Sequence, residues 1–186
     1  MKAIMYHRYG TPDVLECEET EKPTPEDNHV LIRVRAASVN PLECGVIRGA
    51  ARFVNGLRKP KITRLGVDVA GEVEEVGRNV TQFQSGDAVF GVCVRNPQAS
   101  GVGIWSCQGA FAEYVCAHES TLVKKPDNVA FEQAASAFRA PKPCAAVSLC
   151  DADAWNWGTG GPEFKSRRSD QQNQGRRQAC HQASGA

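Results

Sequence analysis

The apolar residues of this chain stop near residue 138. Beyond that point the types Val, Ile, Leu, Met and Phe occur only as Val147, Leu149 and Phe164, and most other residues are Gly, Gln, Ala, Arg or Ser. A segment of this composition buries too little apolar surface to offset the conformational entropy lost on ordering. The sequence therefore predicts a folded domain over residues 1–137 and an irregular tail, disordered or frame-shifted, over residues 138–186.

The two parts also differ in charge. Residues 1–138 carry 15 Lys/Arg and 17 Asp/Glu, whereas residues 139–186 carry 7 and 4, so the whole-chain net charge of +1 combines an acidic body with a basic tail. A total near zero gives no field to attract nucleic acid or an anionic membrane. The tail cations lack interleaved aromatic residues and are interpreted as solvated: Lys165, Arg167, Arg168, Arg176 and Arg177.

No targeting or spanning segment is evident in the sequence. No apolar run approaches the roughly 20 residues needed to cross a bilayer, and the first residues do not lead into the apolar core of a signal peptide. We therefore expect a cytoplasmic protein with no membrane and no nucleic-acid partner. In that compartment the eight cysteines are expected as reduced thiols rather than disulfides.

Alternating hydrophobicity predicts a strand-rich body. Val30, Ile32, Val34 and Ala36 alternate with the residues between them, which is the period-2 pattern of a half-buried strand. Glycines separate the predicted strands, as at the corners of a small barrel. The predicted fold class is mainly β, a compact barrel with short helices. Further strands are expected over residues 2–7, 14–19, 68–76, 88–94, 110–116 and 122–125.

One helix start is clear at residues 40–43. Asn40 is a typical N-cap residue, Pro41 suits the first helical position, and Glu43 stands three residues after the cap, as in a capping box. This helix is expected to end near Gly49. A second helix is expected from about Glu132, where good helix formers cluster.

Several motifs resemble one superfamily. Residues 66–73 (GVDVAGEV) resemble the central motif of the medium-chain dehydrogenase/reductase superfamily. Residues 37–41 (ASVNP) resemble its zinc-independent quinone oxidoreductase branch, and residues 109–115 (GAFAEYV) are similar to the next strand of the family. With the fitting stretches 1–4 and 126–135, the resemblance covers residues 1 to about 137.

The resemblance implies a GroES-like barrel, the alcohol-dehydrogenase-like N-terminal domain, joined to a Rossmann domain that binds NADPH or NADH. It also implies hydride transfer to a quinone, enone or related carbonyl compound. The Rossmann domain is expected to be absent here, because the similarity ends near Ala137. Neither Gly101-Val102-Gly103 nor Gly158-Thr159-Gly160-Gly161 has the context of a dinucleotide fingerprint.

The expected function is therefore that of a truncated N-terminal portion of an NAD(P)H-dependent oxidoreductase, which binds its cofactor weakly. A non-catalytic barrel or interaction module is the alternative. The substrate and the choice between NADPH and NADH stay open. A homo-oligomer also stays open, since the strand that pairs subunits in many relatives belongs to the absent domain.

The resemblance singles out Asn40 as a cofactor-binding residue, because the matching asparagine lies near the nicotinamide end of the dinucleotide. The alternative is that Asn40 only caps its helix. Asp68 is a second cofactor-site candidate, and its alternative is a buried carboxylate satisfied by the backbone or an arginine. The small residues Cys44-Gly45-Val46 replace the bulky residues that often line the cleft in the family. No catalytic residue is assigned.

Zinc is not expected. Val67 and Asn40 stand where zinc alcohol dehydrogenases of this superfamily have two of their ligands, and neither side chain is a suitable zinc ligand. Cys93, Cys107 and Cys116 are too widely spaced for the closely spaced cysteines of a structural zinc lobe.

Overall fold

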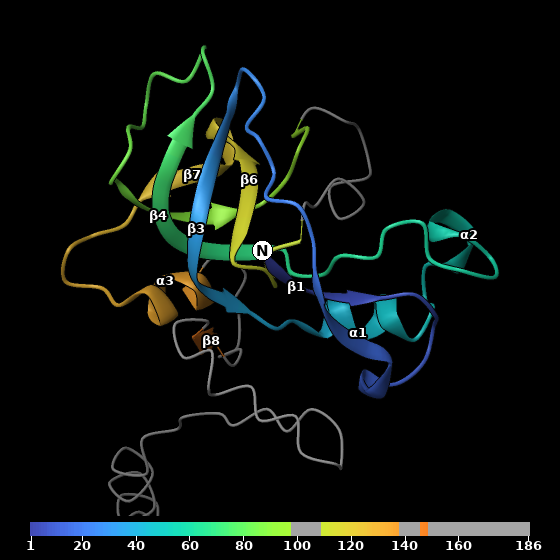
Figure 1. The fold of residues 1–186 in the computed structure, drawn as a ribbon. Coiled ribbons are helices and arrows are strands. Elements are labelled where there is room, and N and C mark those ends of the chain that lie inside the picture. The colour runs from blue at the N-terminus through green and yellow to red at the C-terminus, as the bar shows by residue number, and fades with distance from the viewer. Residues whose placement is uncertain (98–108, 138–145, 149–186) are drawn as a thin grey trace, which may run out of the picture.

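The fold is built around one central strand. A computed structural model of the chain describes residues 1–97, 109–137 and 146–148 (Figure 1). β3 (His29–Ser38) pairs along one edge with β4 (Asp68–Val76) and along the other with β6 (Tyr114–His118) and β8 (Ala146–Ser148). From β4 the sheet continues through β5 (Ala88–Val92) to β7 (Leu122–Lys124), and all of these pairs are antiparallel.

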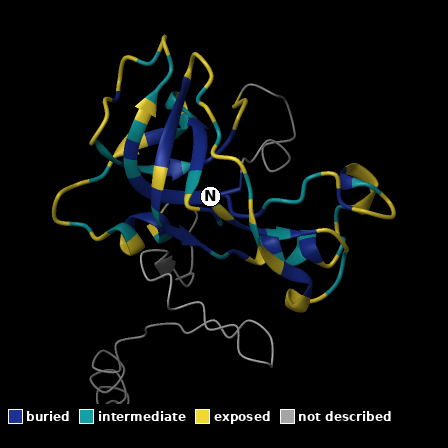
Figure 2. Cartoon of the chain, in the orientation of Figure 1, coloured by how far each residue is buried: buried dark blue, intermediate teal, exposed yellow. Residues whose placement is uncertain are grey.

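The strands curl around an apolar core, and Figure 2 shows the buried residues gathered along them. Val30, Ile32 and Val34 of β3 belong to this core, as their spacing of two predicts. They share it with β-branched residues of the neighbouring strands: Val69, Val73, Val89 and Val115. Such side chains fit a pleated surface well, and their removal from water stabilises the sheet.

A smaller sheet forms a second core with the first helix. β1 (Lys2–Tyr6) pairs with β2 (Leu15–Glu19), and a 3-10 turn, η1 (Pro12–Val14), lies between them. The helix is α1 (Pro41–Ile47), which follows β3. The core they share consists of Ile4, Tyr6, Val14, Leu15, Ile47 and Leu65. This packing fixes α1 beside the end of the central strand.

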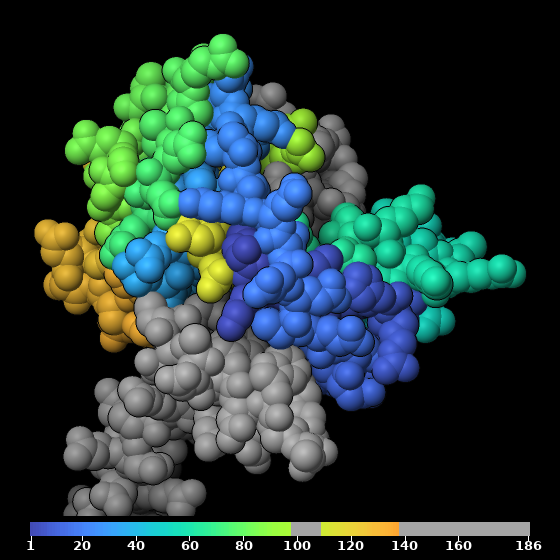
Figure 3. Space-filling model, in the orientation of Figure 1, coloured from blue at the N-terminus to red at the C-terminus, as the bar shows by residue number. Residues whose placement is uncertain are grey.

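Three more short helical segments are described. α2 (Arg52–Asn55) lies on a projection from the body (Figures 1 and 3), and η2 (Glu119–Thr121) links β6 to β7. α3 (Phe131–Ala137) covers the sheet, with Ala134 and Ala135 in one cluster with Ala36 and Ala70. These small side chains allow the helix to lie close to the strands.

The predicted fold class is confirmed. Within the described residues the chain is mainly β with short helices, and it contains no parallel strand pair and no dinucleotide-binding α/β unit. β4 has the predicted bounds, and β1, β2, β3, β5 and β7 differ from the prediction by at most two residues at an end. In the same described part, no helix is long and apolar enough to cross a membrane.

One predicted strand is wrong in position. The strand expected over residues 110–116 lies at Tyr114–His118. The preceding residues bond to other parts of the chain: the N–H of Ile4 donates to the carbonyl of Phe111 at 2.8 Å, and the N–H of Phe111 donates to the carbonyl of Leu65 at 3.0 Å. Sequence alternation does not reveal which partner a segment will find.

The sequence analysis also did not predict α2 or β8, which are too short to show a periodic pattern. The Gly101–Gly103 motif and, apart from β8, the predicted tail lie outside the described residues. The domain boundary at residue 137 stays a prediction.

Candidate functional site

The candidate site lies where β3 ends and β4 begins. The antiparallel register pairs Ala37 with Val69, so the residues next to them, Ser38 and Asp68, meet at this end of the sheet. The chain then leaves β3 and enters α1 at Asn40. Strand register and the helix start therefore bring Ser38 and Asn40 together with Asp68, which lies about 30 residues further along the sequence.

Asp68 is the centre of this group. Its Oδ2 accepts one hydrogen bond from Ser38 Oγ and another from Asn40 Nδ2, each 2.9 Å long. Asp68 is only 1% exposed and Asn40 only 6%. The other oxygen, Oδ1 of Asp68, is buried and has no hydrogen-bond partner among the residues that the structure describes. Buried polar atoms are nearly always satisfied, so this acceptor needs an explanation.

Glu43 holds Asn40 from the other side. The backbone N–H of Asn40 donates to Glu43 Oε2 at 2.9 Å, and Asn40 Nδ2 lies 3.5 Å from Glu43 Oε1. This is the capping box that the sequence predicted, with Pro41 at the first helical position. Burial raises the pKa of Glu43 and the negative charge of Asp68 adds to the effect, whereas hydrogen bonds from the backbone and from Asn40 oppose it.

A small cavity adjoins the capped helix. Its volume is about 30 Å³, and polar groups reach it from several elements, among them Tyr6, Glu43, Asn55 and Arg64. Burial raises the pKa of Tyr6 to about 12. A space of this size accommodates a few water molecules.

The structure brings together the two residues that the sequence analysis selected, Asn40 and Asp68. The partners of Asp68 Oδ2 are neither the backbone nor an arginine, which its alternative interpretation expected, but two polar side chains. Sequence reasoning missed Ser38. In the sequence, Ser38 is visible as a polar residue at the end of the apolar run of β3. Only the register between β3 and β4 shows that Ser38 meets Asp68.

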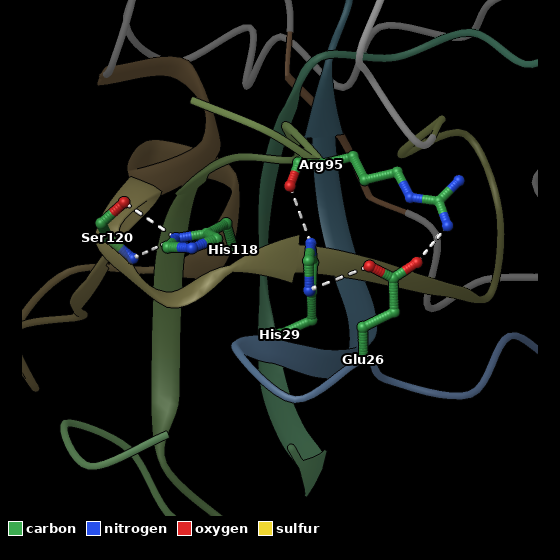
Figure 4. Close-up of polar contacts among 5 residues, drawn as sticks. All are labelled: Glu26, His29, Arg95, His118 and Ser120. Atoms are coloured by element: carbon green, nitrogen blue, oxygen red, sulfur yellow. Dashed lines mark hydrogen bonds and ion pairs between the residues drawn. The ribbon is translucent and has the colours of Figure 1, made fainter. Parts of the chain in front are cut away.

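A second polar cluster lies at the other end of β3, about 30 Å away along the strand. Figure 4 shows Glu26, His29 and Arg95 on one side of it and His118 with Ser120 on the other. His29 Nε2 lies 2.8 Å from the Arg95 carbonyl, and the two imidazole rings meet edge to face with centroids 5.4 Å apart. These contacts tie β6 and the Arg95 loop to the start of β3.

Metal ligands do not converge in either cluster. In the part of the chain that the structure describes, no group of three or more His, Cys, Asp or Glu residues could hold a metal ion. Of the cysteines there, Cys17, Cys44 and Cys116 are free thiols, and the buried Cys93 thiol donates to the carbonyl of Gly66 at 3.2 Å. Burial raises the pKa of Cys116 to about 11, so this thiol stays protonated at neutral pH.

The fold is that of a GroES-like barrel of the alcohol dehydrogenase type. Its antiparallel sheet is curled, and the helix at the end of the central strand is capped by Asn40, which bonds to the buried Asp68. The chain belongs to the alcohol dehydrogenase GroES-like domain family, whose profile matches residues 26–127.

Known proteins of this kind are similar over most of the chain. A quinone oxidoreductase of Sus scrofa is 34% identical over 138 residues, which are 73% of this chain and 37% of the relative. A chloroplastic quinone-oxidoreductase homolog of Spinacia oleracea is 34% identical over 137 residues, 73% of this chain and 38% of the relative. The solved quinone oxidoreductase of Coxiella burnetii is 35% identical with a TM-score of 0.62, covering 74% of this chain and 41% of that one.

These similarities confirm the predicted superfamily and its quinone oxidoreductase-like branch. The chain spans about 37% of the length of the curated relatives it matches.

Proposed function

We propose that this chain is the barrel portion of an NAD(P)H-dependent oxidoreductase that transfers hydride to a quinone, enone or related carbonyl compound without zinc. Its family membership and the quinone oxidoreductases among its relatives support the proposal. The relatives are much longer, so in this proposal the dinucleotide phosphates are held by a Rossmann domain outside the aligned region. The barrel contributes the wall against which the nicotinamide end would lie.

The observation that carries the proposal is the fixed orientation of Asn40. A carboxylate only accepts hydrogen bonds, so Asn40 must turn its Nδ2 group toward Asp68 Oδ2, 2.9 Å away. The backbone N–H of Asn40 is held by Glu43 at the same time. An amide oriented in this way is prepared to bind a ribose hydroxyl or a carboxamide, and the cofactor would supply the hydride when bound.

Asp68 has a different role in this proposal. Asp68 is only 1% exposed, so a ligand can hardly reach it, whereas Asn40 is 6% exposed. We therefore assign Asn40 to cofactor contact and Asp68 to the positioning of Asn40. The unpartnered Oδ1 of Asp68 is the acceptor that a ligand hydroxyl or a water molecule entering beside Asn40 would satisfy.

The proposal is tested by NMR titration of the full 186-residue chain with NADPH and, separately, with AMP. We expect the side-chain amide signals of Asn40 to move with NADPH and not with AMP, because AMP lacks the nicotinamide end. An Asn40→Ala variant should weaken the NADPH-induced shifts of its neighbours, and Asn79→Ala, which alters an exposed asparagine elsewhere, should not. If NADPH leaves Asn40 and its neighbours unmoved, Asn40 is not a cofactor contact in this chain, and the alternative of a non-catalytic barrel is favoured.

A further inference from the structure

A strongly basic segment follows α1. Residues 48–67 contain six Lys/Arg and no Asp or Glu, although the chain as a whole has a net charge of only +1. Five of these cations are exposed: Arg48, Arg52, Arg58, Lys59 and Lys61. The expectation of no membrane partner rests on the lack of a spanning apolar run and on total charge, and total charge hides this local concentration.

The same segment exposes large apolar side chains. Phe53 is 91% exposed, Leu57 65% and Val54 59%. Among the described residues, the one other exposed large hydrophobic residue is Val123. We call Phe53, Val54 and Leu57 together with the five exposed cations the 48–61 tip. Figure 3 shows its central part projecting from the body, and Figure 2 shows the exposed residues around α2. Clustered exposed apolar groups usually mark an interaction site.

A buried scaffold holds this tip outward. Asn55 Nδ2 donates to the hydroxyl of Tyr6 at 2.9 Å, and Asn55 Oδ1 accepts from the N–H of Ile62 at 2.8 Å, so the Asn55 amide ties the loop to β1 and closes the loop on itself at Ile62. The Tyr9 hydroxyl donates to the carbonyl of Gly56 at 2.7 Å. Gly56 has φ +110, and a Cβ there would lie 2.2 Å from the Lys59 carbonyl oxygen. The exposed apolar residues are therefore presented by an ordered turn.

We propose that the 48–61 tip docks the protein on an anionic lipid surface, with Phe53 and Leu57 entering the headgroup layer and the surrounding cations binding lipid phosphates and carboxylates. An apolar centre with a Lys/Arg rim is the combination that interfacial membrane segments use. The three exposed apolar side chains stand on a projection, not on the broad face that buries roughly 800 Å² per partner in a standard protein interface. A fluid headgroup layer, in contrast, adapts to a convex tip.

The test is flotation of the full chain with vesicles. We expect binding to phosphatidylcholine vesicles that contain about one third phosphatidylserine, little binding to phosphatidylcholine alone, and weakening by added salt. The double variant Arg58→Glu/Lys59→Glu should weaken binding at least tenfold, given on the order of fivefold for each cation lost. Phe53→Ser/Leu57→Ser should weaken binding even at low salt.

Matched controls separate the tip from general charge and from the tail. Lys2→Glu/Arg78→Glu makes the same change in net charge elsewhere on the surface, and Val123→Ser removes an apolar side chain that is 47% exposed. All variants keep residues 138–186, so any tail contribution is constant. Circular dichroism checks that each variant is folded. If the tip variants bind vesicles like their controls, the lipid-docking proposal is wrong. It is also wrong if the tip variants change only the oligomeric mass of the protein measured by analytical ultracentrifugation, because the tip then joins copies of this chain.

Discussion

The side-chain amide of Asn40 donates a 2.9 Å hydrogen bond to Oδ2 of Asp68, and both residues are buried. This contact connects the start of α1 to the first residue of β4. It therefore has a structural effect that can be measured without any cofactor.

A double-mutant cycle should detect this coupling. We expect Asn40→Ala and Asp68→Ala to interact by about 1.5–3 kcal/mol in the free energy of urea unfolding, the usual range for a hydrogen bond to a charged group. A second cycle that pairs Asp68→Ala with Asn79→Ala should be additive within about 0.5 kcal/mol. Equal coupling in the two cycles would show that the Asn40–Asp68 contact contributes nothing specific.

Glu43 should make stability depend on pH. Its pKa is raised by burial in the folded chain, so the folded state binds the proton more tightly than the unfolded state. The stability that this proton contributes is present at low pH and is lost as the pH rises from the ordinary value of 4.5 through the raised pKa. Glu43→Gln keeps an acceptor for the Asn40 N–H and removes the titration.

We therefore expect Glu43→Gln to gain stability relative to the wild type as the pH is raised through that window, measured by urea unfolding. Glu16→Gln, at an exposed position of β2, gives the baseline for removing one negative charge. If Glu43→Gln instead loses stability relative to the wild type as the pH is raised, the raised pKa assigned to Glu43 is wrong.

Tyr6→Phe should destabilise the barrel by about 1–3 kcal/mol, because the substitution leaves the buried Asn55 amide without its 2.9 Å acceptor. The folded pKa of about 12 lies above the ordinary 10.0, so the stability contributed by the neutral phenol should be lost between pH 10 and 12. Titration of the phenol absorbance should show one late-ionising tyrosine that is absent from Tyr6→Phe. Tyr114→Phe, at a partly exposed ring, should retain it.

Gly66→Ala should be more costly than Gly86→Ala. Both glycines have positive φ, +95 and +92, so alanine is strained at either position by about 1–3 kcal/mol. A Cβ at Gly66 would also lie 2.7 Å from the backbone nitrogen of Phe111, whereas nothing lies within 4 Å at Gly86. Thermal unfolding of the two variants measures the difference, and equal losses would mean that the backbone around Phe111 yields easily.

Local patterns were sufficient for much of the fold. The bounds of β4, the alternation in β3 and the capping box from Asn40 to Glu43 all follow from residues close together in the sequence. Asn40 and Asp68 could be selected only through the family resemblance. Their contact depends on the register of β3 and β4, which no local pattern encodes.

The tip was beyond local reasoning for a related reason. α2 is four residues long, and its position depends on a hydrogen bond between Asn55 and Tyr6, which are 49 residues apart. The exposure of Phe53 follows from that distant anchor.

The pairing of β8 with β3 affects how the chain can be shortened. β8 bonds to Ala36–Ser38, the part of β3 that leads into Asn40, while β6 occupies the same edge further back at His29–Arg33. A version ending at the predicted boundary of residue 137 would leave these backbone groups as a bare strand edge. Such an edge recruits strands from other molecules. Aggregation of the shortened protein would then begin beside the residues proposed to meet the cofactor.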